Sequence, residues 1–458
     1  MTIVGNAPVN AQRTAQRTAL RTTQRTALRA DLLDFSAAPQ WCNTGLQGVR
    51  WRPDHWLLID TDGRIAGVQP GAQQPDPSWH CEDHRGCLLM PGFIDSHVHS
   101  AQLSVIASHG SALLDWLQRY TFPAEMAFAD EAIAARGARG FLDALLAHGT
   151  TAAAVFPTVH KVSVDTLFAA ASERGMRLIS GKVLMDRNAP AGLCDTVAQA
   201  ERDYEDTISR WHAKGRNSVA VTVRFAPTST PRQLAMAGAL CRADASLYMQ
   251  THVAENRDEL RWVSELFPRA RSYLDVYEQV GLLHPRSVLA HGIWLDDADR
   301  ALLHQRGAQV AFCPSSNLCL GSGLFDWKAA ASARVAVSLA SDVGGGNSLS
   351  MQGTLADAIK VQALLGQRPS AWDALYAATL GCAKALTLDH EIGQLQAGHM
   401  ADLCLWFWSR GAVDEQRLQA ATELHEKVFA WMMLSDERHL HSTWVAGRRL
   451  FEASPALS

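Results

Sequence analysis

The amino-acid sequence predicts an α/β protein, a (β/α)8 TIM barrel with a small β-sandwich domain built from both chain ends. Two observations lead to this fold class. Through the middle of the chain, short apolar runs alternate with longer segments of helical pattern, which is typical of repeated β-α units around a parallel sheet. Patterns of strands and turns occur at both ends of the chain, outside that alternation.

Eight apolar runs are predicted to be the barrel strands. They span residues 92–98, 151–156, 178–184, 219–225, 247–253, 288–290, 310–312 and 335–340. Between them, stretches such as 131–147, 231–244 and 351–365 carry helix-forming residues with apolar spacing, and Pro231 suits a first helical turn. Eight repeated β-α units close a barrel.

Both chain ends carry hairpin patterns, which predict a second, smaller domain. Near the start, a turn at Asp62-Gly63 separates the strand-like residues 56–60 and 65–68. The far end has a similar pattern around a turn at Ala446-Gly447, with strand-like residues 401–407, 443–445 and 449–451. We expect residues 31–90 and 395–458 to build one β domain together, and residues 91–394 to form the barrel.

Residues 11–30 repeat a four-residue unit in the order AQRT, AQRT, ALRT, TQRT, ALRA. This is low-complexity sequence, so we expect residues 1–30 to be a solvated, disordered tail and assign it no function. Arginines without acids also occur in organellar transit peptides, which leaves that alternative open.

The composition of the 458 residues describes a globular protein, since 47% are hydrophobic and 19% are charged. A net charge of -4 creates no general field for a polyanion, so we expect a small-molecule substrate and no nucleic-acid partner. The nine cysteines are scattered without a CxxC pair, which favours neither a disulfide framework nor a thiolate metal site. Without a long apolar run or a secretory signal, we expect a cytoplasmic protein and no membrane partner.

Side chains that can bind a metal or act in catalysis lie at the ends of five predicted strands. His97 and His99 follow the first run, Arg224 ends the fourth, His252 and Glu255 end the fifth, His291 follows the sixth and Asp342 follows the eighth. In barrels of this kind the chemistry sits at the C-terminal ends of the strands. We therefore expect these side chains to meet in one site.

His97 and His99 are two residues apart on an extended chain, so both imidazoles point to the same side. An HxH pair alone is a weak signal among 18 histidines. His252 and Asp342 complete a set of nitrogen and oxygen donors suited to Zn²⁺ with an open position for water. The same donors also accept iron.

Glu255 lies three residues beyond His252 and is the candidate acid or base that faces the substrate. The alternative is that Glu255 caps a helix starting near Arg257, where the helix dipole favours a carboxylate. His291 could be a core histidine, but at the mouth of its strand it is placed to bond the attacking water or the reacting ring.

Several motifs together make the chain resemble the amidohydrolase superfamily. They are PGFIDSHVH at 91–99, THVAEN at 251–256, AHG at 290–292 and Ser341-Asp342. Further motifs resemble the guanine deaminases, a branch related to the triazine-type (ATZ/TRZ-like) deaminases. These are LDWL at 114–117, YTFPAE at 120–125, Arg224-Phe225, CPSSNL at 313–318 and SDVGGGNSLSM at 341–351. The resemblance begins near Trp56 and excludes the AQRT repeats.

The resemblance implies one zinc ion per chain, with His97, His99, His252 and Asp342 as ligands. Relatives with two metals carry a bridging, carboxylated lysine on the fourth strand, whereas residues 218–227 contain no lysine. Lys182 on the third run is then expected to be structural or to lie behind the ligands. Relatives of this kind are commonly homodimers, and we expect the same here.

The implied activity is hydrolysis of guanine to xanthine and ammonia, a step of purine catabolism. The metal would lower the pKa of its bound water toward about 7, and Asp342 would take the proton. Hydroxide would then attack C2, while Glu255 would protonate N3 and His291 would steady the attacking oxygen. The resemblance also implies which residues surround the purine: Gln102, Arg224, Phe225, His252 and Glu255.

Phe225 and Trp116 would offer an apolar wall for the base, although each is also an ordinary core aromatic. Arg224 would favour the C6 carbonyl of guanine over the C6 amino group of adenine. Its alternative is a structural ion pair with an acid outside the site.

Two other functions stay open. One is deamination of another ring, such as 8-oxoguanine, an adenine derivative or an aminotriazine, which a substrate panel would distinguish. The other is a catalytically inactive barrel scaffold, for which zinc content is the discriminating measurement.

Overall fold

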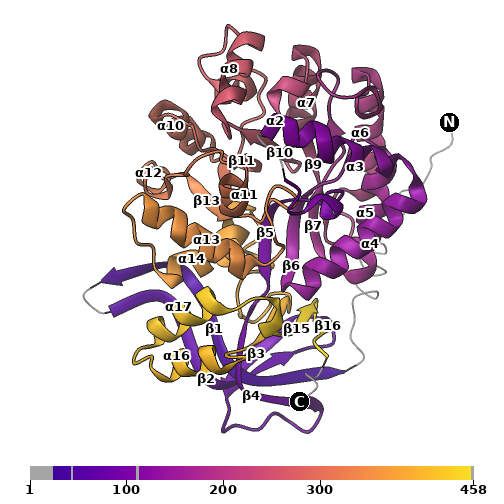
Figure 1. Ribbon diagram of the computed structural model, residues 1–458. Coiled ribbons are helices and arrows are strands. Elements are labelled where there is room, and N and C mark those ends of the chain that lie inside the picture. The colour runs from indigo at the N-terminus through magenta and orange to yellow at the C-terminus, as the bar shows by residue number, and fades with distance from the viewer. Residues whose placement is uncertain (1–23, 43–44, 110–112, 455–458) are drawn as a thin grey trace, which may run out of the picture.

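The computed structural model describes residues 24–42, 45–109 and 113–454. Figure 1 shows two parts, a barrel surrounded by helices and, below it, a sheet to which indigo N-terminal and yellow C-terminal segments both contribute. Within the described part of the chain, no helix combines the length and the apolar character needed to cross a membrane.

Parallel strands form the barrel, which confirms the predicted fold class. They are β5 (Phe93–His99), β6 (Thr150–Phe156), β7 (Arg177–Ser180), β8 (Val183–Leu184), β9 (Asn217–Val223), β10 (Tyr248–Val253), β11 (Ser287–His291), β12 (Gln309–Phe312) and β13 (Ala336–Leu339). Their order is β5-β6-β7-β9-β10-β11-β12-β13, and β8 pairs with β9. The backbone N–H of Asp342 donates to the carbonyl of His97 at 3.0 Å, which joins the segment after β13 to β5 and nearly closes the barrel.

The third predicted run differs from the observed strands. The sequence predicts one strand over residues 178–184, but these residues form β7 and β8 with a break at Gly181-Lys182. A Cβ atom on Gly181 would lie only 1.8 Å from the carbonyl oxygen of Ala220 on β9. The break therefore lies where the backbone approaches β9 too closely for any side chain.

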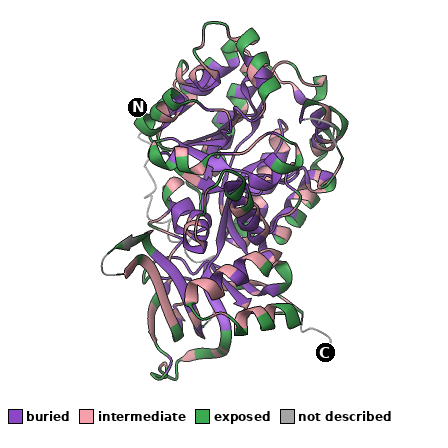
Figure 2. Cartoon of the chain, turned by 60° about the vertical axis from the view of Figure 1, so that its left-hand side comes forward, coloured by how far each residue is buried: buried purple, intermediate pink, exposed green. Residues whose placement is uncertain are grey.

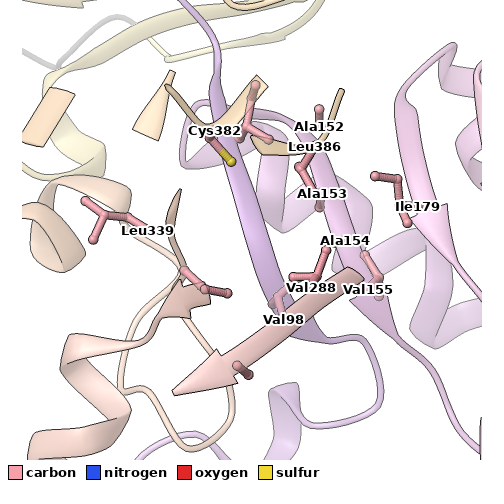
Figure 3. Close-up of a cluster of buried hydrophobic side chains, with 14 of the residues drawn as sticks. Val98, Ala152, Ala153, Ala154, Val155, Ile179, Val288, Leu339, Cys382 and Leu386 are labelled. Atoms are coloured by element: carbon pink, nitrogen blue, oxygen red, sulfur yellow. The ribbon is translucent and has the colours of Figure 1, made fainter. Parts of the chain in front are cut away.

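Every residue of β5, β6, β9 and β11 is buried, because helices cover the outside of the barrel and side chains fill its interior. Figure 3 shows part of this core, including the consecutive small residues Ala152, Ala153 and Ala154 of β6. Cys382 and Leu386, from α15 and its C-terminal end, belong to the same cluster.

Most helices have exposed outer faces and buried inner faces, as the green and purple parts of the ribbon in Figure 2 show. Three have nearly the predicted bounds: α4 (Glu131–Ala147), α7 (Pro231–Ala243) and α13 (Met351–Leu364). Pro231 opens α7, and the Thr230 hydroxyl caps it by accepting from the N–H of Gln233. The others are α2 (Leu113–Trp116), α3 (Phe122–Met126), α5 (Lys161–Arg174), α6 (Val197–Trp211), α8 (Arg257–Leu266), α9 (Tyr273–Glu278), α10 (Asp297–Arg306), α11 (Pro314–Cys319), α12 (Trp327–Ser332), α14 (Ala371–Ala378), α15 (Leu380–Ala385), α16 (Ala412–Gln419) and α17 (Leu424–Leu434).

The second part is a seven-stranded sheet in the order β16-β15-β14-β4-β1-β2-β3. Its strands are β1 (Arg25–Cys42), β2 (Gly45–Ile59), β3 (Ile65–Pro70), β4 (Trp79–Pro91), β14 (Leu403–Phe407), β15 (Leu440–Val445) and β16 (Arg448–Glu452). The predicted sandwich is thus one continuous hydrogen-bonded sheet, whose long strands β1 and β2 change register near Ala30 and Phe35. Both chain ends contribute to it, as the hairpin patterns predict.

The turns of the two predicted hairpins touch each other. A Cβ atom on Gly63, where φ is +79°, would lie 2.3 Å from the carbonyl oxygen of Ala446. A Cβ atom on Gly447 would lie 2.9 Å from the Cα atom of Gly63. Glycine at both positions therefore lets the two chain ends come together.

The boundary of the predicted tail differs from the structure. β1 begins at Arg25, so the end of the repeat segment is a strand, and Leu28 and Ala30 are fully buried. These residues pair with β2 and β4. A four-residue repeat has no local sign of such partners, which is why composition alone extends the tail to residue 30. Residues 1–23 lie outside the described residues.

A buried ion-pair network joins the barrel to the sheet. Arg216, just before β9, donates to both carboxylate oxygens of Asp402, at 3.0 and 2.7 Å, and to Glu391 at 2.5 Å. Asp402 directly precedes β14. Burial alone would raise the pKa of Glu391, but the charges of Arg216 and Arg177 outweigh burial and lower that pKa to about 2.

Candidate active site

The predicted metal ligands meet at the C-terminal ends of the barrel strands. His97 and His99 lie at the end of β5, His252 lies near the end of β10, and Asp342 follows β13. His291, the last residue of β11, joins them, with its ring centroid 5.5 Å from that of His252. Five side chains from four strand ends therefore surround one point.

Three imidazole nitrogens and one carboxylate oxygen form a compact donor set. Nε2 of His97 is 3.2 Å from Nε2 of both His99 and His252, and the latter two are 3.3 Å apart. Oδ1 of Asp342 is 3.2 Å from Nε2 of both His97 and His99. Donors placed about 2.0 Å from an ion at the corners of a tetrahedron are about 3.3 Å apart. The donor set therefore fits a divalent metal.

His291 also offers a ligand atom, because His97, His252, His291 and Asp342 have such atoms within 4.8 Å of one another. However, Nε2 of His291 is 3.7 Å from Oδ2 of Asp342, whereas Nε2 of His99 is 3.2 Å from Oδ1 of Asp342. Its Nδ1 atom lies 2.9 Å from Oδ1 of Asn317, which orients the ring. We therefore assign His99 to the donor set, and His291 to the space beside it.

The electrostatics suit metal binding. Burial lowers the pKa of His97 to about 4, and burial together with neighbouring histidine charges lowers the pKa of His252 well below its ordinary value. Burial alone would raise the pKa of Asp342, but hydrogen bonds with His97 and His99 outweigh burial and hold that pKa well below the ordinary value. Neutral imidazoles and an ionised carboxylate are the forms that bind a metal.

Hydrogen bonds behind the donors fix their orientation. The Nδ1 atom of His252 lies 2.7 Å from the carbonyl oxygen of Arg224. Asp95 accepts from the backbone N–H groups of His97, at 3.2 Å, and Ser341, at 3.1 Å, and from the Ser341 hydroxyl. Burial raises the pKa of Asp95 to about 7. Asp95 thus ties β5 to the segment that carries Asp342, a role that sequence reasoning missed although PGFIDSHVH contains the residue.

Two residues of the site have a backbone conformation that residues other than glycine rarely adopt. The φ angle is +71° at His291 and +47° at Asp342, both in the left-handed region. Such conformations cluster at functional sites, where the surrounding structure imposes them. Because neither residue is a glycine, the sequence does not indicate that the backbone is left-handed at these two positions.

Glu255 does not have the capping role considered as its alternative. The N-cap of α8 is Asn256, and Glu259 completes the capping box. The Glu255 carboxylate accepts instead from the Ser322 hydroxyl at 2.9 Å, and its Oε2 atom is 3.4 Å from Nε2 of His291. Burial raises the pKa of Glu255, which favours the protonated form that a general acid needs.

A pocket opens beside the donor set. Its lining residues are His99, Gln102, Leu113, Trp116, Leu117, Arg224, Phe225, His252, Glu255, Glu259, His291, Leu320, Asp342 and Gly345. Every side chain for which the sequence predicts substrate contact is among them. Phe225 and Trp116 give the pocket two buried aromatic walls.

Arg224 forms the ion pair that was considered as the alternative to substrate contact. Its Nη1 atom donates to both carboxylate oxygens of Glu125, at 2.7 and 2.6 Å. The pair lies at the pocket wall, since Arg224 itself lines the pocket, so an ion pair and a substrate contact do not exclude each other. Sequence reasoning missed Glu125, which it treated only as part of the YTFPAE motif.

A family model described as "Amidohydrolase family" matches residues 88–450. The chain belongs to the amidohydrolase family. It is 42% identical to the guanine deaminase of Escherichia coli (strain K12), over 86% of this chain and 91% of that protein. It is 38% identical to a probable guanine deaminase of Deinococcus radiodurans, over 92% of this chain and 98% of that protein. These relatives confirm the resemblance inferred from the motifs.

Solved structures of amidohydrolases agree with this assignment. The structure of Escherichia coli guanine deaminase has a TM-score of 0.89 and 39% sequence identity, and the match covers 94% of this chain and 100% of that chain. A guanine deaminase from C. acetobutylicum, solved with bound guanine in its active site, has a TM-score of 0.84 and 25% identity, covering 93% and 100%.

In this amidohydrolase, Lys182 does not lie at the donor set. Its ammonium group pairs with Asp195 and lies 3.7 Å from Asp203, and its side chain is 2% exposed. β9, the fourth strand of the barrel, contains no lysine. The buried ion pairs agree with the structural role expected for Lys182.

Proposed function

We propose that this protein hydrolyses guanine to xanthine and ammonia. The observation that carries the proposal is the pocket itself, in which the metal donor set, the carboxyl group of Glu255 and the guanidinium of Arg224 line one cavity. The names of the relatives support it. Water adds at C2 and the C2 amino group leaves as ammonia, so the reaction requires no redox partner.

The donor chemistry supports zinc as the metal, one ion per chain, held by His97, His99, His252 and Asp342. When bound, the ion would act as a Lewis acid that makes water nucleophilic at neutral pH. Iron is the competing metal for these donors, and elemental analysis of the purified protein distinguishes the two.

Three side chains would move or hold protons. Glu255 would deliver a proton to N3 of the ring and recover one from the new hydroxyl group at C2 as the amine leaves, and its raised pKa suits the first transfer. Asp342 would hold the proton taken from the attacking water at Oδ2 and pass it to the leaving amine. Nε2 of His291 lies 3.4 Å from Oε2 of Glu255 and 3.7 Å from Oδ2 of Asp342, so His291 would orient the water between two carboxyl groups.

The remaining pocket residues would hold the purine. Phe225 and Trp116 would contact the faces of the flat ring, with His252 beside the reacting carbon. Arg224 would donate to the carbonyl oxygen at C6, and Gln102 would add an amide contact on a neighbouring edge. Adenine has an amino group at C6, so it would leave the guanidinium without an acceptor.

The test is ammonia release and xanthine formation from guanine at neutral pH by metal-replete protein. Adenine, 8-oxoguanine and an aminotriazine form the comparison panel. We expect kcat/KM to be largest for guanine by at least tenfold. A larger kcat/KM for another ring would reassign the substrate, and a protein that binds metal but turns over no ring would support the inactive scaffold.

The assembly and location of the protein are separate proposals. We propose a homodimer, on the resemblance to relatives of this kind, and a cytoplasmic location, as expected from the sequence analysis. Light scattering of the purified protein measures the first, and fractionation of cells that express it measures the second.

A further inference from the structure

One carboxylate, that of Glu125, joins two side chains of the pocket wall. Gln102 donates from Nε2 to Oε1 of Glu125 at 2.9 Å, and Nη1 of Arg224 donates to Oε1 and Oε2 at 2.7 and 2.6 Å. The three residues come from different parts of the chain: after β5, in α3 and after β9. Glu125 is completely buried and does not line the pocket, whereas Gln102 and Arg224 do. Glu125 therefore lies behind the residues that face a ligand.

The ion pair leaves donors of Arg224 available. Both hydrogen bonds to Glu125 come from Nη1, so the pair does not use the two-nitrogen fork by which arginine usually grips a carboxylate. Among the described residues, no group accepts a hydrogen bond from Nε or Nη2 of Arg224. The side chain of Arg224 is only 4% exposed, so these donors are largely shielded from bulk solvent.

The helix α3 holds the guanidinium from two sides. Phe122 and Glu125 are three residues apart on one helix and therefore lie on the same face. The ring centroid of Phe122 is 5.4 Å from Cζ of Arg224, which allows a cation–π contact while Glu125 binds Nη1. The spacing in the motif YTFPAE thus has a physical reason, since it supplies an aromatic ring and a carboxylate to one arginine.

Glu125 also fixes the orientation of the Gln102 amide. An ionised carboxylate only accepts hydrogen bonds, so the amide must turn its NH2 group toward Glu125. The Gln102 oxygen then faces the backbone N–H of Gly344, which donates to it at 3.2 Å. Hydrogen bonds therefore fix both ends of this amide, and an amide flipped by 180° would lose both hydrogen bonds.

We infer that Glu125 is a positioning residue that holds Arg224 and Gln102 for a ring with a carbonyl group at the pocket wall. The inference rests on the proposed function for the identity of that ring. Because Glu125 neutralises the guanidinium of Arg224, the wall favours a neutral acceptor, such as a ring carbonyl. A site built to donate hydrogen bonds discriminates against a ring that lacks the acceptor, because its buried donors stay unpaired.

The test replaces Glu125 by glutamine and compares two ligands that differ at C6 and at C2. Hypoxanthine carries the C6 carbonyl but no amino group to lose, whereas 2-aminopurine carries the amino group but no carbonyl. Calorimetry of the metal-replete protein measures both dissociation constants. For Glu125→Gln we expect hypoxanthine to bind at least tenfold more weakly, 2-aminopurine to change less than threefold, and kcat/KM for guanine to fall by about 10².

Glu391→Gln is the matched control, since Glu391 is also a carboxylate bound to an arginine, with a side chain only 16% exposed, but at the domain junction. We expect it to lower the melting temperature without changing the ratio of the two dissociation constants. If Glu125→Gln also lowers only the melting temperature, Glu125 is merely structural and the inference fails. Because Glu125 acts partly through Arg224, a double variant with Arg224→Gln should lose less than the sum of the two single losses, and fully additive losses would contradict the proposed route through Arg224.

Two further measurements keep the inference decidable. If Glu125→Gln does not fold, Glu125→Asp keeps the charge but shortens the side chain, and unchanged hypoxanthine affinity in that variant would overturn the inference. If the wild-type protein releases no ammonia from guanine, the proposed function fails, yet the two binding constants still report on Glu125. Failure of wild-type protein to prefer hypoxanthine over 2-aminopurine would overturn carbonyl recognition itself.

Discussion

Glu255 lies where the metal donor set meets the pocket, beside His291 and the Ser322 hydroxyl. Glutamine at this position keeps the shape of the side chain and an acceptor for Ser322, but it cannot release a proton. We expect Glu255→Gln to retain metal and melting temperature and to lower kcat for guanine by about 10² or more. Steady-state kinetics with metal analysis checks this, and nearly normal turnover would mean that Glu255 is not the acid.

At Arg224 the charge and the planar fork can be tested separately. Arg224→Gln should lower kcat/KM for guanine by at least about 10², equivalent to about 2.7 kcal/mol, with unchanged metal content. Arg224→Lys should recover only part of this loss, because lysine keeps the charge but lacks the fork. Wild-type kcat/KM in Arg224→Gln, together with early melting, would leave Arg224 with only its ion pair to Glu125.

The sequence of β9 argues against a second metal ion. It contains no lysine, and Lys182 between β7 and β8 is paired with Asp195 and Asp203. We therefore expect one divalent ion per chain at full activity, and loss of activity after treatment with a chelator. Elemental analysis against protein concentration measures the ratio, and two ions per chain at full activity would contradict this expectation.

Apolar runs located the barrel strands well, because buried parallel strands are apolar on both faces and are bounded by polar strand ends. His97, His99, His252 and Asp342 could be found for the same reason, as they follow such runs. The break at Gly181 depends on contact with Ala220, and the role of Glu125 depends on contact with Gln102 and Arg224. Such contacts between distant segments leave no local periodicity, so the sequence could not predict them.

For the whole molecule, the network of Arg216, Glu391 and Asp402 links stability to pH. The pKa of Glu391 falls from 4.5 to about 2 on folding, because the charges of Arg216 and Arg177 outweigh burial. A lowered carboxyl pKa stabilises the fold above about 4.5, and this stabilisation is lost as the pH falls toward about 2. Its full size is on the order of 3 kcal/mol.

We therefore expect the melting temperature of the wild-type protein to exceed that of Glu391→Gln at pH 7, and the difference to shrink between pH 4.5 and about 2. Calorimetric scans of both proteins across this range measure the difference. A gap that is constant with pH would assign the effect of the substitution to packing alone.

The sheet order also has a consequence for synthesis of the chain. β4 pairs with β14 on one side, through Cys87–Pro91 and Leu403–Phe407, and with β1 on the other. The ribosome makes β14 about 310 residues after β4, which takes about 15–60 s at ordinary elongation rates. During that interval β4 is an open edge with unpaired backbone groups. It also carries the apolar side chains of Leu88, Leu89 and Met90, which are buried in the folded protein. A nascent chain released before β14 is made would carry an unpaired strand edge that can pair with other chains, whereas β14 covers this edge in the complete protein.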